Sequence, residues 1–343
     1  MKKSLLALAA LTAFAGAASA QSSVTLFGIV DAGVARLSAG GKSVTGMTNS
    51  GYNSSRLGFR GVEDLGGGLQ AGFWLEGALS NDDGTAGKFD FRRRSTVSLM
   101  GGFGEIRLGR DYTPTFWNTT VYDVFGTNGI GQALTPGMIS GAAGNSTNAV
   151  RADNAVSYFL PGNLGGFQGQ FMYAFGENVS GGVKTNNYMG FRLGYASGPI
   201  SAHVAYGKTD GATDATDVKY LNFGGSFNAG VVKVNLVVAQ EKNGAGLKWQ
   251  AIEPSVSVPV GAGTIKASYA RHDLKDSDND FNKIAVGYHH DLSKRTTVYT
   301  TYARVSNKGA SAVVVANNGL TGKVAAAAGG NASGFEFGVR HSF

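Results

Sequence analysis

The sequence predicts an all-β fold, a 16-stranded antiparallel barrel that crosses a membrane with its strands. From Val24 to Phe343, apolar and polar residues alternate with a period of two in sixteen segments. The segments average about ten residues, the length of a tilted membrane strand, whereas strands of soluble proteins average about five or six. Short glycine-rich turns and long polar loops alternate between them, as expected for a closed membrane barrel with its two rims built differently.

The composition excludes several other classes of protein. The chain has 343 residues, of which 53 are glycine and none is cysteine, so it is not a disulfide scaffold. Charged residues make up only 15% of the chain, against roughly 25% in soluble domains. Beyond residue 20 no apolar run reaches the roughly 18 positions that a membrane helix needs. The abundant glycine suits a curved sheet, in which it relieves crowding and permits bends.

The first element is a secretory signal peptide over residues 1–20. Lys2 and Lys3 precede an apolar stretch, and the small residues 18–20 form a cleavage pattern. Cleavage leaves residues 21–343 as a single transmembrane barrel domain. An exported chain without cysteine fits the periplasm or outer membrane of a Gram-negative bacterium, where disulfides are permitted but not required.

The strands follow in order, beginning with residues 24–36. Each later pair is joined by a tight turn, as by the three glycines of 66–68 or by Gly165 and Gly166. The predicted hairpins are 55–64 with 69–80, 89–100 with 104–111, 153–160 with 167–177, 187–197 with 199–208, 217–228 with 231–242, 248–260 with 263–274, and 281–291 with 296–307. Residues 334–343 form the last strand. We expect the tight turns at the periplasmic rim and the long loops (37–53, 112–152, 178–186, 209–216 and 308–333) at the extracellular rim.

The alternation sorts the side chains into a lipid face and a lumen face. Arg56 and Arg60 alternate with Leu57 and Phe59. Because an arginine that faces lipid at mid-membrane costs about 2–4 kcal/mol, the basic face must line a water-filled interior. The same parity turns at least nine cations inward, against three acids (Glu76, Glu253 and Glu336); the cations are Arg56, Arg60, Arg92, Arg94, Arg107, Arg192, Lys233, Lys266 and Arg340. Arg93 falls on the apolar parity, so we expect it near a rim or a subunit contact.

Four of these arginines, Arg56, Arg60, Arg92 and Arg94, belong to strands that are neighbours in sequence. They can therefore cluster on one wall, and a basic lining favours anions. Sixteen strands enclose an aqueous channel, whereas eight would be filled by side chains. In the alternative interpretation, the arginines pair with acids of the long loop, such as Asp111 and Asp123, and little selectivity remains.

Five stretches carry a resemblance to a known family: SSVTLFGIVDAGV at 22–34, SRLGFRGVEDLGGGLQAGFWLE at 55–76, LGRDYTP at 108–114, RADNAVSYFLPGNLGGFQGQFMYAFGE at 151–177 and GFEFGVRHSF at 334–343. In these stretches the chain resembles the general porins of beta-proteobacterial outer membranes, and most of all their anion-selective members. The resemblance implies an outer-membrane channel for passive diffusion of small hydrophilic solutes, and a homotrimer in contact with outer-membrane lipid and lipopolysaccharide.

The resemblance also implies a constriction. The third long loop, residues 111–150, would fold into the barrel; its length alone already calls for a function of its own. The family's arginine cluster matches Arg56, Arg94 and Arg151 best, with Arg92 and Arg60 as the nearest alternatives and Glu76 and Asp123 as candidate acids. Small anionic solutes would pass there. The terminal Phe343 resembles the aromatic signature that the barrel-assembly machinery recognises.

No catalytic chemistry is predicted. A hydrolase in a barrel would need a nucleophile with histidine and carboxylate partners, but His272 and Asp273 are adjacent on a strand and point to opposite faces. No cofactor, metal or nucleic acid is expected. The acidic loop with Asp276, Asp278 and Asp280 leaves a divalent cation at the outer rim as an open alternative. The other open alternative is a substrate-specific pore for dicarboxylates or phosphate, with a saturable internal site.

Overall fold

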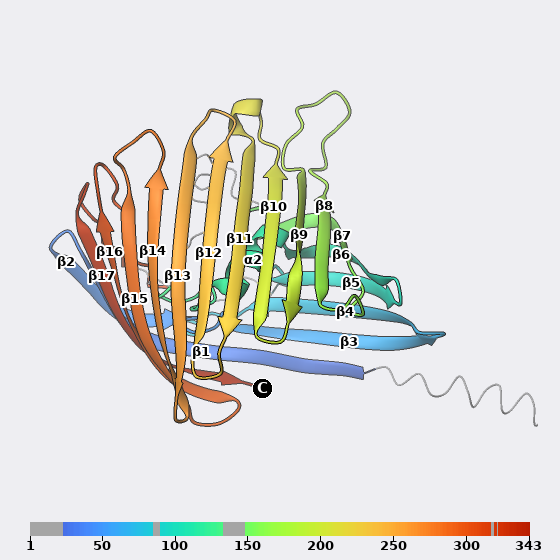
Figure 1. Ribbon diagram of the computed structural model, residues 1–343, viewed down its shortest axis with the longest axis horizontal. Coiled ribbons are helices and arrows are strands. Elements are labelled where there is room, and N and C mark those ends of the chain that lie inside the picture. Colours follow the sequence, from blue (N-terminus) through green and yellow to red (C-terminus); the bar gives the residue numbers. More distant parts are fainter. Residues whose placement is uncertain (1–22, 85–89, 133–147, 317–318, 321) are drawn as a thin grey trace, which may run out of the picture.

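The strands form one closed antiparallel barrel. The computed structural model describes residues 23–84, 90–132, 148–316, 319–320 and 322–343 (Figure 1); the expected signal peptide, residues 1–20, lies outside them. The elements are β1 (Ser23–Ala39), β2 (Lys42–Asn49), β3 (Arg56–Gly66), β4 (Leu69–Ala78), β5 (Arg94–Gly101), β6 (Gly104–Tyr112), α2 (Pro114–Tyr122), β7 (Arg151–Phe159), β8 (Phe167–Ala174), β9 (Tyr188–Ser197), β10 (Ile200–Thr209), the short η2 (Asp214–Thr216), β11 (Val218–Asn228), β12 (Lys233–Asn243), β13 (Lys248–Val260), β14 (Gly263–Leu274), β15 (Phe281–Asp291), β16 (Thr296–Asn307) and β17 (Asn331–Ser342).

Strand β1 closes the barrel because it pairs on both edges. One edge of its first half, from Ser23 to Ile29, pairs with β3. The other edge of its second half, from Ile29 to Ala39, pairs with β17. From β3 to β17 each strand pairs with the next. The closed ring thus contains sixteen strands, all those described except β2, which confirms the predicted fold.

The extra strand β2 corrects the predicted loop over 37–53. Residues 42–49 fold back on the upper half of β1 through a two-residue turn. Gly40 and Gly41 both have positive φ, at 58° and 74°. Two residues of positive φ give the tight hairpin turn whose twist matches that of its strands, and glycine adopts it without strain. Residues 42–49 of the predicted loop therefore form an extension of the barrel wall.

Strand β5 corrects a second boundary. The alternation in 89–100 predicted a strand through the whole stretch, but pairing with β4 begins only at Arg94. Residues 90–93 are not in a strand, although the Arg93 N–H still donates to the Glu76 carbonyl at 3.1 Å. The period-two rule for side-chain faces therefore does not apply to Arg92 and Arg93.

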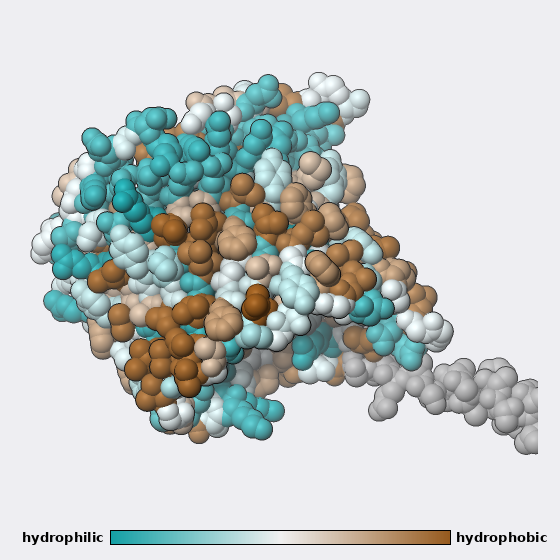
Figure 2. Space-filling view, in the orientation of Figure 1, coloured by the Kyte–Doolittle hydropathy of each residue, from teal (hydrophilic) through white to brown (hydrophobic). Residues whose placement is uncertain are grey.

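The two faces of the wall differ as predicted. Large apolar side chains such as Val34, Val97 and Phe337 are exposed on the outside, each more than half exposed. The opposite parity is polar and turned into the barrel, as for Asp31 and Glu336, which are fully buried. Figure 2 shows brown, hydrophobic residues across the middle of the outer surface and teal, hydrophilic residues gathered toward the loop end above them. None of the described helices is long and apolar enough to cross a membrane.

In its described residues, 113–132 and 148–150, the long connection after β6 runs inside the barrel. Helix α2 lies against β9 to β12 (Figure 1). Thr113 caps its first turn, accepting a hydrogen bond from the Phe116 N–H at 3.4 Å, and Pro114 occupies the first helical position. Among the described residues, an apolar cluster at the loop end includes Phe125 and Ile130 from this connection together with Leu37 from β1. The third long loop is thus folded inward over the part that the structure describes.

Candidate functional site in the barrel lumen

Strand register places the core of the site. Glu76 on β4 is paired with Arg94 on β5 and with Gly58 on β3, so the three residues share the lumen face. One row nearer the periplasmic turns, Trp74 is paired with Arg60 and Thr96. Paired residues have Cβ atoms about 5 Å apart, so side chains of both rows are within reach of one another.

Glu76 is held by two arginines. Its Oε1 lies 2.6 Å from Arg93 Nε and 3.3 Å from Arg56 Nη1. Its Oε2 accepts a hydrogen bond from Trp74 Nε1 at 3.1 Å. The carboxylate is almost wholly enclosed, with 7% of its side chain exposed, while Arg56 retains 21%. One carboxylate thus neutralises at most one of two guanidinium groups.

A second carboxylate, Asp111, holds the next two arginines. Its Oδ2 lies 2.6 Å from Arg107 Nη1 and 3.5 Å from Arg94 Nε. Arg107 is also paired with Glu105, at 2.8 Å. Arg94 places its guanidinium 4.6 Å from the centre of the Trp74 ring, which restrains the charged group on an aromatic face. These contacts fix the orientation of both arginines against the wall.

Arg151 joins the cluster through a bulge. In β7 two residues, Asp153 and Asn154, stand opposite the single residue Arg110 of β6, and Asn154 has a φ of 52°. Beyond this bulge the Arg151 Nε donates to the Arg93 carbonyl at 2.7 Å. The Arg151 guanidinium also lies 4.3 Å from the centre of the Tyr112 ring.

The other two candidate arginines lie apart from these ion pairs. Arg60 stacks on aromatic rings at the periplasmic side, 5.1 Å from Trp74 and 5.4 Å from Phe27. Arg92 points into solvent with 75% of its side chain exposed and pairs with Asp90. The expected inward placement of Arg92 and the expected rim or subunit contact of Arg93 are therefore wrong, because the strand begins only at Arg94.

The candidate acid Asp123 is placed elsewhere. It ends helix α2 and accepts hydrogen bonds from the N–H groups of Phe125 and Thr127, both at 2.9 Å. Burial raises the pKa of Asp123, and the two N–H donors offset this only in part. Its charged neighbours are Lys283 and Glu253 of the opposite wall. Within the described chain it contacts none of the five candidate arginines. The acids that do lie among arginines there are Glu76, Asp111 and Glu105.

A cavity of about 690 Å³ opens in the lumen beside the cluster. Five arginines and two carboxylates line it: Arg56, Arg93, Arg94, Arg107 and Arg192 with Glu76 and Asp111. Trp117 of the inward loop lines it as well, so wall and loop meet there. The sequence interpretation missed Arg93 as a member of the cluster; the triple-arginine run at 92–94 was visible, but the start of the strand was not.

Polar contacts fix helix α2 against the opposite wall. Asn118 Nδ2 donates to Asn222 Oδ1 at 2.6 Å, and Asn222 Nδ2 donates to the Thr115 carbonyl at 2.9 Å. The Tyr122 hydroxyl lies 2.6 Å from His203 Nδ1. Because these groups are buried and mutually satisfied, the helix has a defined position relative to the arginine wall.

The segment that follows helix α2 in the loop is anchored on β15 and β17. The Ile130 N–H donates to Glu336 Oε2 at 3.3 Å, and Lys283 Nζ donates to the Gln132 carbonyl. Both wall residues belong to the lumen face.

The C-terminal residue contributes to closure of the barrel. Phe343 exchanges two backbone hydrogen bonds with Gly28, each of 3.0 Å. A Cβ at position 28 would lie 2.3 Å from the Phe343 ring, so the ring rests on a glycine of β1.

A closed sixteen-stranded barrel with an apolar outside, a charged lumen and an inward loop is a channel of the outer-membrane type. The chain belongs to the Gram-negative porin family, whose model matches residues 7–310. It is therefore a porin of the Gram-negative outer membrane, a channel and not an enzyme, as the sequence predicted.

Individual porins agree with this assignment. Outer membrane porin protein 32 of Delftia acidovorans is 46% identical over the whole of both chains. An outer membrane porin protein of Bordetella pertussis is 32% identical over 89% of this chain and 94% of its own. The solved structure described as an anion-selective porin from Comamonas acidovorans aligns with a TM-score of 0.86 and 42% identity, covering 94% of this chain and 100% of that one.

Proposed function

We propose that this porin is an anion-preferring diffusion channel whose constriction is the arginine cluster facing the inward loop. The observation that carries the proposal is the charge imbalance of the cavity lining, where five guanidinium groups accompany two carboxylates. Guanidinium groups stay protonated at every physiological pH, so the imbalance is permanent. The similarity to a porin described as anion-selective supports the same proposal.

The mechanism is electrostatic. Two charges about 4 Å apart in water interact by about 1 kcal/mol, and more where the wall excludes water. Glu76 faces both Arg56 and Arg93, so it leaves one positive charge uncompensated. The next two arginines, Arg94 and Arg107, are matched by Asp111 and Glu105. Arg151 and Arg60 add to this field, because no described carboxylate lies within ion-pair distance of either. A small anion therefore meets an attractive lining, and a cation of equal size meets a repulsive one.

The test is the reversal potential of single channels in a KCl gradient. The wild type is expected to prefer chloride. Arg94→Ala and Arg56→Ala should each move the reversal potential toward that of a less selective pore, while Arg271→Ala, on the outward face of β14, should leave it unchanged. Cation preference in the wild type, or equal effects of all three substitutions, would contradict the proposal.

A more selective version of this function is our second candidate. The same cavity carries the amides of Gln168 and Gln170 beside Arg192, a donor set that suits a dicarboxylate or phosphate. Such a porin would show a saturable block of the chloride current by one of these solutes, but not by a different solute of equal charge. A linear response to all of them favours the general diffusion channel.

We also infer a homotrimer, as in the resemblance noted above. Its support is the exposed apolar outside of the barrel, which lipid and neighbouring copies would share. Light scattering of the detergent-solubilised protein, corrected for bound detergent, measures the state directly: a mass of one barrel would contradict the inference.

A further inference from the structure

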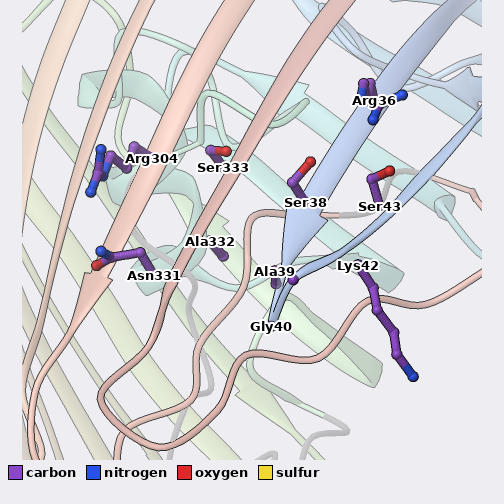
Figure 3. Close-up of a pocket in the computed structure, with 11 residues that line it drawn as sticks. Arg36, Ser38, Ala39, Gly40, Lys42, Ser43, Arg304, Asn331, Ala332 and Ser333 are labelled. Atoms are coloured by element: carbon purple, nitrogen blue, oxygen red, sulfur yellow. The ribbon is translucent and has the colours of Figure 1, made fainter.

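The lumen cavity is lined by aromatic side chains as well as by arginines. Its four described aromatic residues from β4, β6, α2 and β7 are Trp74, Tyr112, Trp117 and Phe159. A basic pocket on the outside of the barrel differs in this respect: Arg36 and Arg304 line it together with serine hydroxyls, and no described residue of its lining is aromatic (Figure 3). Attraction of small anions needs only the charges, so the rings of the lumen cavity call for a separate explanation.

Three of the four rings already hold an arginine. The guanidinium carbon lies 4.1–4.6 Å from the ring centre in the pairs Arg94–Trp74, Arg107–Phe159 and Arg151–Tyr112. Within the described chain no lysine or arginine lies over the ring of Trp117. The indole of Trp117 is therefore the aromatic surface that a solute can use.

Helix α2 presents this indole to the lumen. Trp117 is 42% exposed, although the helix lies inside the barrel, and Val121, one turn further on the same face, is 38% exposed. The opposite face of the helix, with Asn118 and Tyr122, is buried against the wall. Large apolar side chains are favoured in the interior of a protein, so an exposed pair beside an aqueous path indicates a surface that binds something apolar.

Tyr112 connects the indole to the arginine cluster. Its ring centre lies 6.0 Å from that of Trp117, with the two planes inclined by 30°. Its hydroxyl accepts a hydrogen bond from Arg93 Nη2 at 3.3 Å. Arg56 shares Glu76 with Arg93, keeps 21% of its side chain exposed and lines the same cavity. An apolar ring face and an incompletely neutralised guanidinium group thus border one cavity.

We propose that this cavity binds aromatic carboxylates, with the ring of the solute on the Trp117 indole and its carboxylate on Arg56. The inference rests on the anion-preferring channel proposed above and names a class of solute for it. Arginine binds a carboxylate through two parallel hydrogen bonds, and stacked aromatic rings attract each other beyond the area that they bury. The volume of about 690 Å³ falls in the range of small-molecule sites.

The experiment measures block of the chloride current through single channels of the folded, purified porin. The probes are benzoate, cyclohexanecarboxylate and the uncharged benzamide. The two carboxylates have the same charge and a similar size, but only benzoate can stack. Benzoate should block the wild type saturably, at a concentration about two- to ten-fold lower than cyclohexanecarboxylate, which is the effect of one aromatic stack. Benzamide lacks the charge and should not block.

Variants of Trp117 locate the site. Trp117→Leu keeps an apolar side chain on the helix but removes the ring, so the half-blocking concentrations of the two carboxylates should become equal. Trp117→Phe retains a ring and should retain the preference for benzoate. The matched control Phe223→Leu makes a similar exchange on the outward face of β11, at a residue that is 44% exposed, and should be blocked like the wild type.

Folding of every variant is checked by the shift of the unheated band in gel electrophoresis. Should Trp117→Leu not fold, Trp117→Gln, which also lacks a ring, takes its place. Equal half-blocking concentrations of the two carboxylates in the wild type, block by benzamide as strong as that by benzoate, or an undiminished benzoate preference without the ring at position 117 would each overturn the proposal.

The reversal potential in a KCl gradient, recorded on the same channels, separates this proposal from the proposed function. Chloride preference without a preference for benzoate refutes the class of solute and leaves the anion channel standing. Cation preference refutes the anion channel, and with it the inference that rests on it.

Discussion

Arg93 Nε lies 2.6 Å from Glu76 Oε1, and this ion pair sets the charge balance of the lumen cluster. Since Glu76 is already held by Arg93, Arg56 gains only a longer contact of 3.3 Å and stays partly exposed to the cavity. The pair also brings the Arg93 carbonyl to Arg151, whose Nε donates to it at 2.7 Å. A residue outside any strand thus links three of the cluster's arginines.

The run Arg92 to Arg94 gives a direct test of this arrangement. Arg93→Ala removes a charge beside the cavity. It should lower chloride permeability and raise potassium permeability, each about two- to six-fold, as expected for one charge roughly 4–10 Å from the ion path in water. Arg92→Ala removes a charge that is exposed and paired with Asp90, so the two permeabilities should change little. Reversal potentials measure both; equal effects of the two substitutions would contradict the assignment. Arg93→Lys, which keeps the charge, should remain close to wild type.

Gly224 is required by the ring of Tyr122. A Cβ at position 224 would lie 2.0 Å from Tyr122 Cδ2, whereas a Cβ at Gly225 has its nearest neighbour at 3.4 Å. Gly224→Ala should therefore displace Tyr122 from His203, lower the melting temperature and change the single-channel conductance, and Gly225→Ala should do neither. Adding Tyr122→Ala to Gly224→Ala should restore part of the stability. Additive losses in this double-mutant cycle would argue against the contact.

The amide pair between loop and wall gives a third prediction. Asn222→Ala removes the partner of Asn118 and the donor to the Thr115 carbonyl. Each buried group left without a partner costs about 1–3 kcal/mol, so helix α2 should loosen and current noise should rise. The matched control is Asn282→Ala, on the outward parity of β15. Quiet channels with unchanged thermal stability in the Asn222 variant would show that the loop is held by other contacts.

Asp31 anchors the segment between β2 and β3. Its Oδ2 accepts hydrogen bonds from the N–H groups of Tyr52 and Asn53, at 2.8 and 2.6 Å, and its Oδ1 accepts one from the Tyr299 hydroxyl at 2.7 Å. Asp31→Ala leaves three donors without an acceptor, so it should destabilise the barrel by about 3 kcal/mol or more and expose residues 50–55 to protease. Asp153→Ala, at a carboxylate that is 65% exposed, should have no such effect. A protease-resistant Asp31 variant would refute this role.

The predicted role of Phe343 in assembly is tested by deleting that residue. The chain would lose the two hydrogen bonds to Gly28 and the ring that rests on β1. We expect less folded porin in outer membranes and more unfolded chain in the periplasm. The folded fraction is measured by gel electrophoresis, in which the unheated folded barrel and the heated unfolded chain migrate as different bands. Ser342→Ala, which keeps the terminal aromatic residue, is the control, and equal yields of the two variants would speak against an assembly signal.

The period-two alternation determined most of the wall from the sequence alone. It gave the sixteen strands of the ring and the inward parity of Glu76, Glu253 and Glu336. This succeeded because side chains alternate strictly within a strand and lipid excludes charge from one face. It failed where a strand begins or bulges: at Arg93 before β5, at Asp153 and Asn154 in β7, and at the β2 hairpin.

The sequence by itself thus determined the barrel, its outer-membrane setting and the excess of cations in its lumen, because these follow from local alternation and composition. Only the tertiary structure decided which carboxylate meets which arginine, that Asp123 ends a helix while Asp111 joins the cluster, and that Arg93 belongs to the cluster as well. The physical reason is that pairing across strands, and the path of a loop inside a closed barrel, depend on register and closure between residues far apart in the chain.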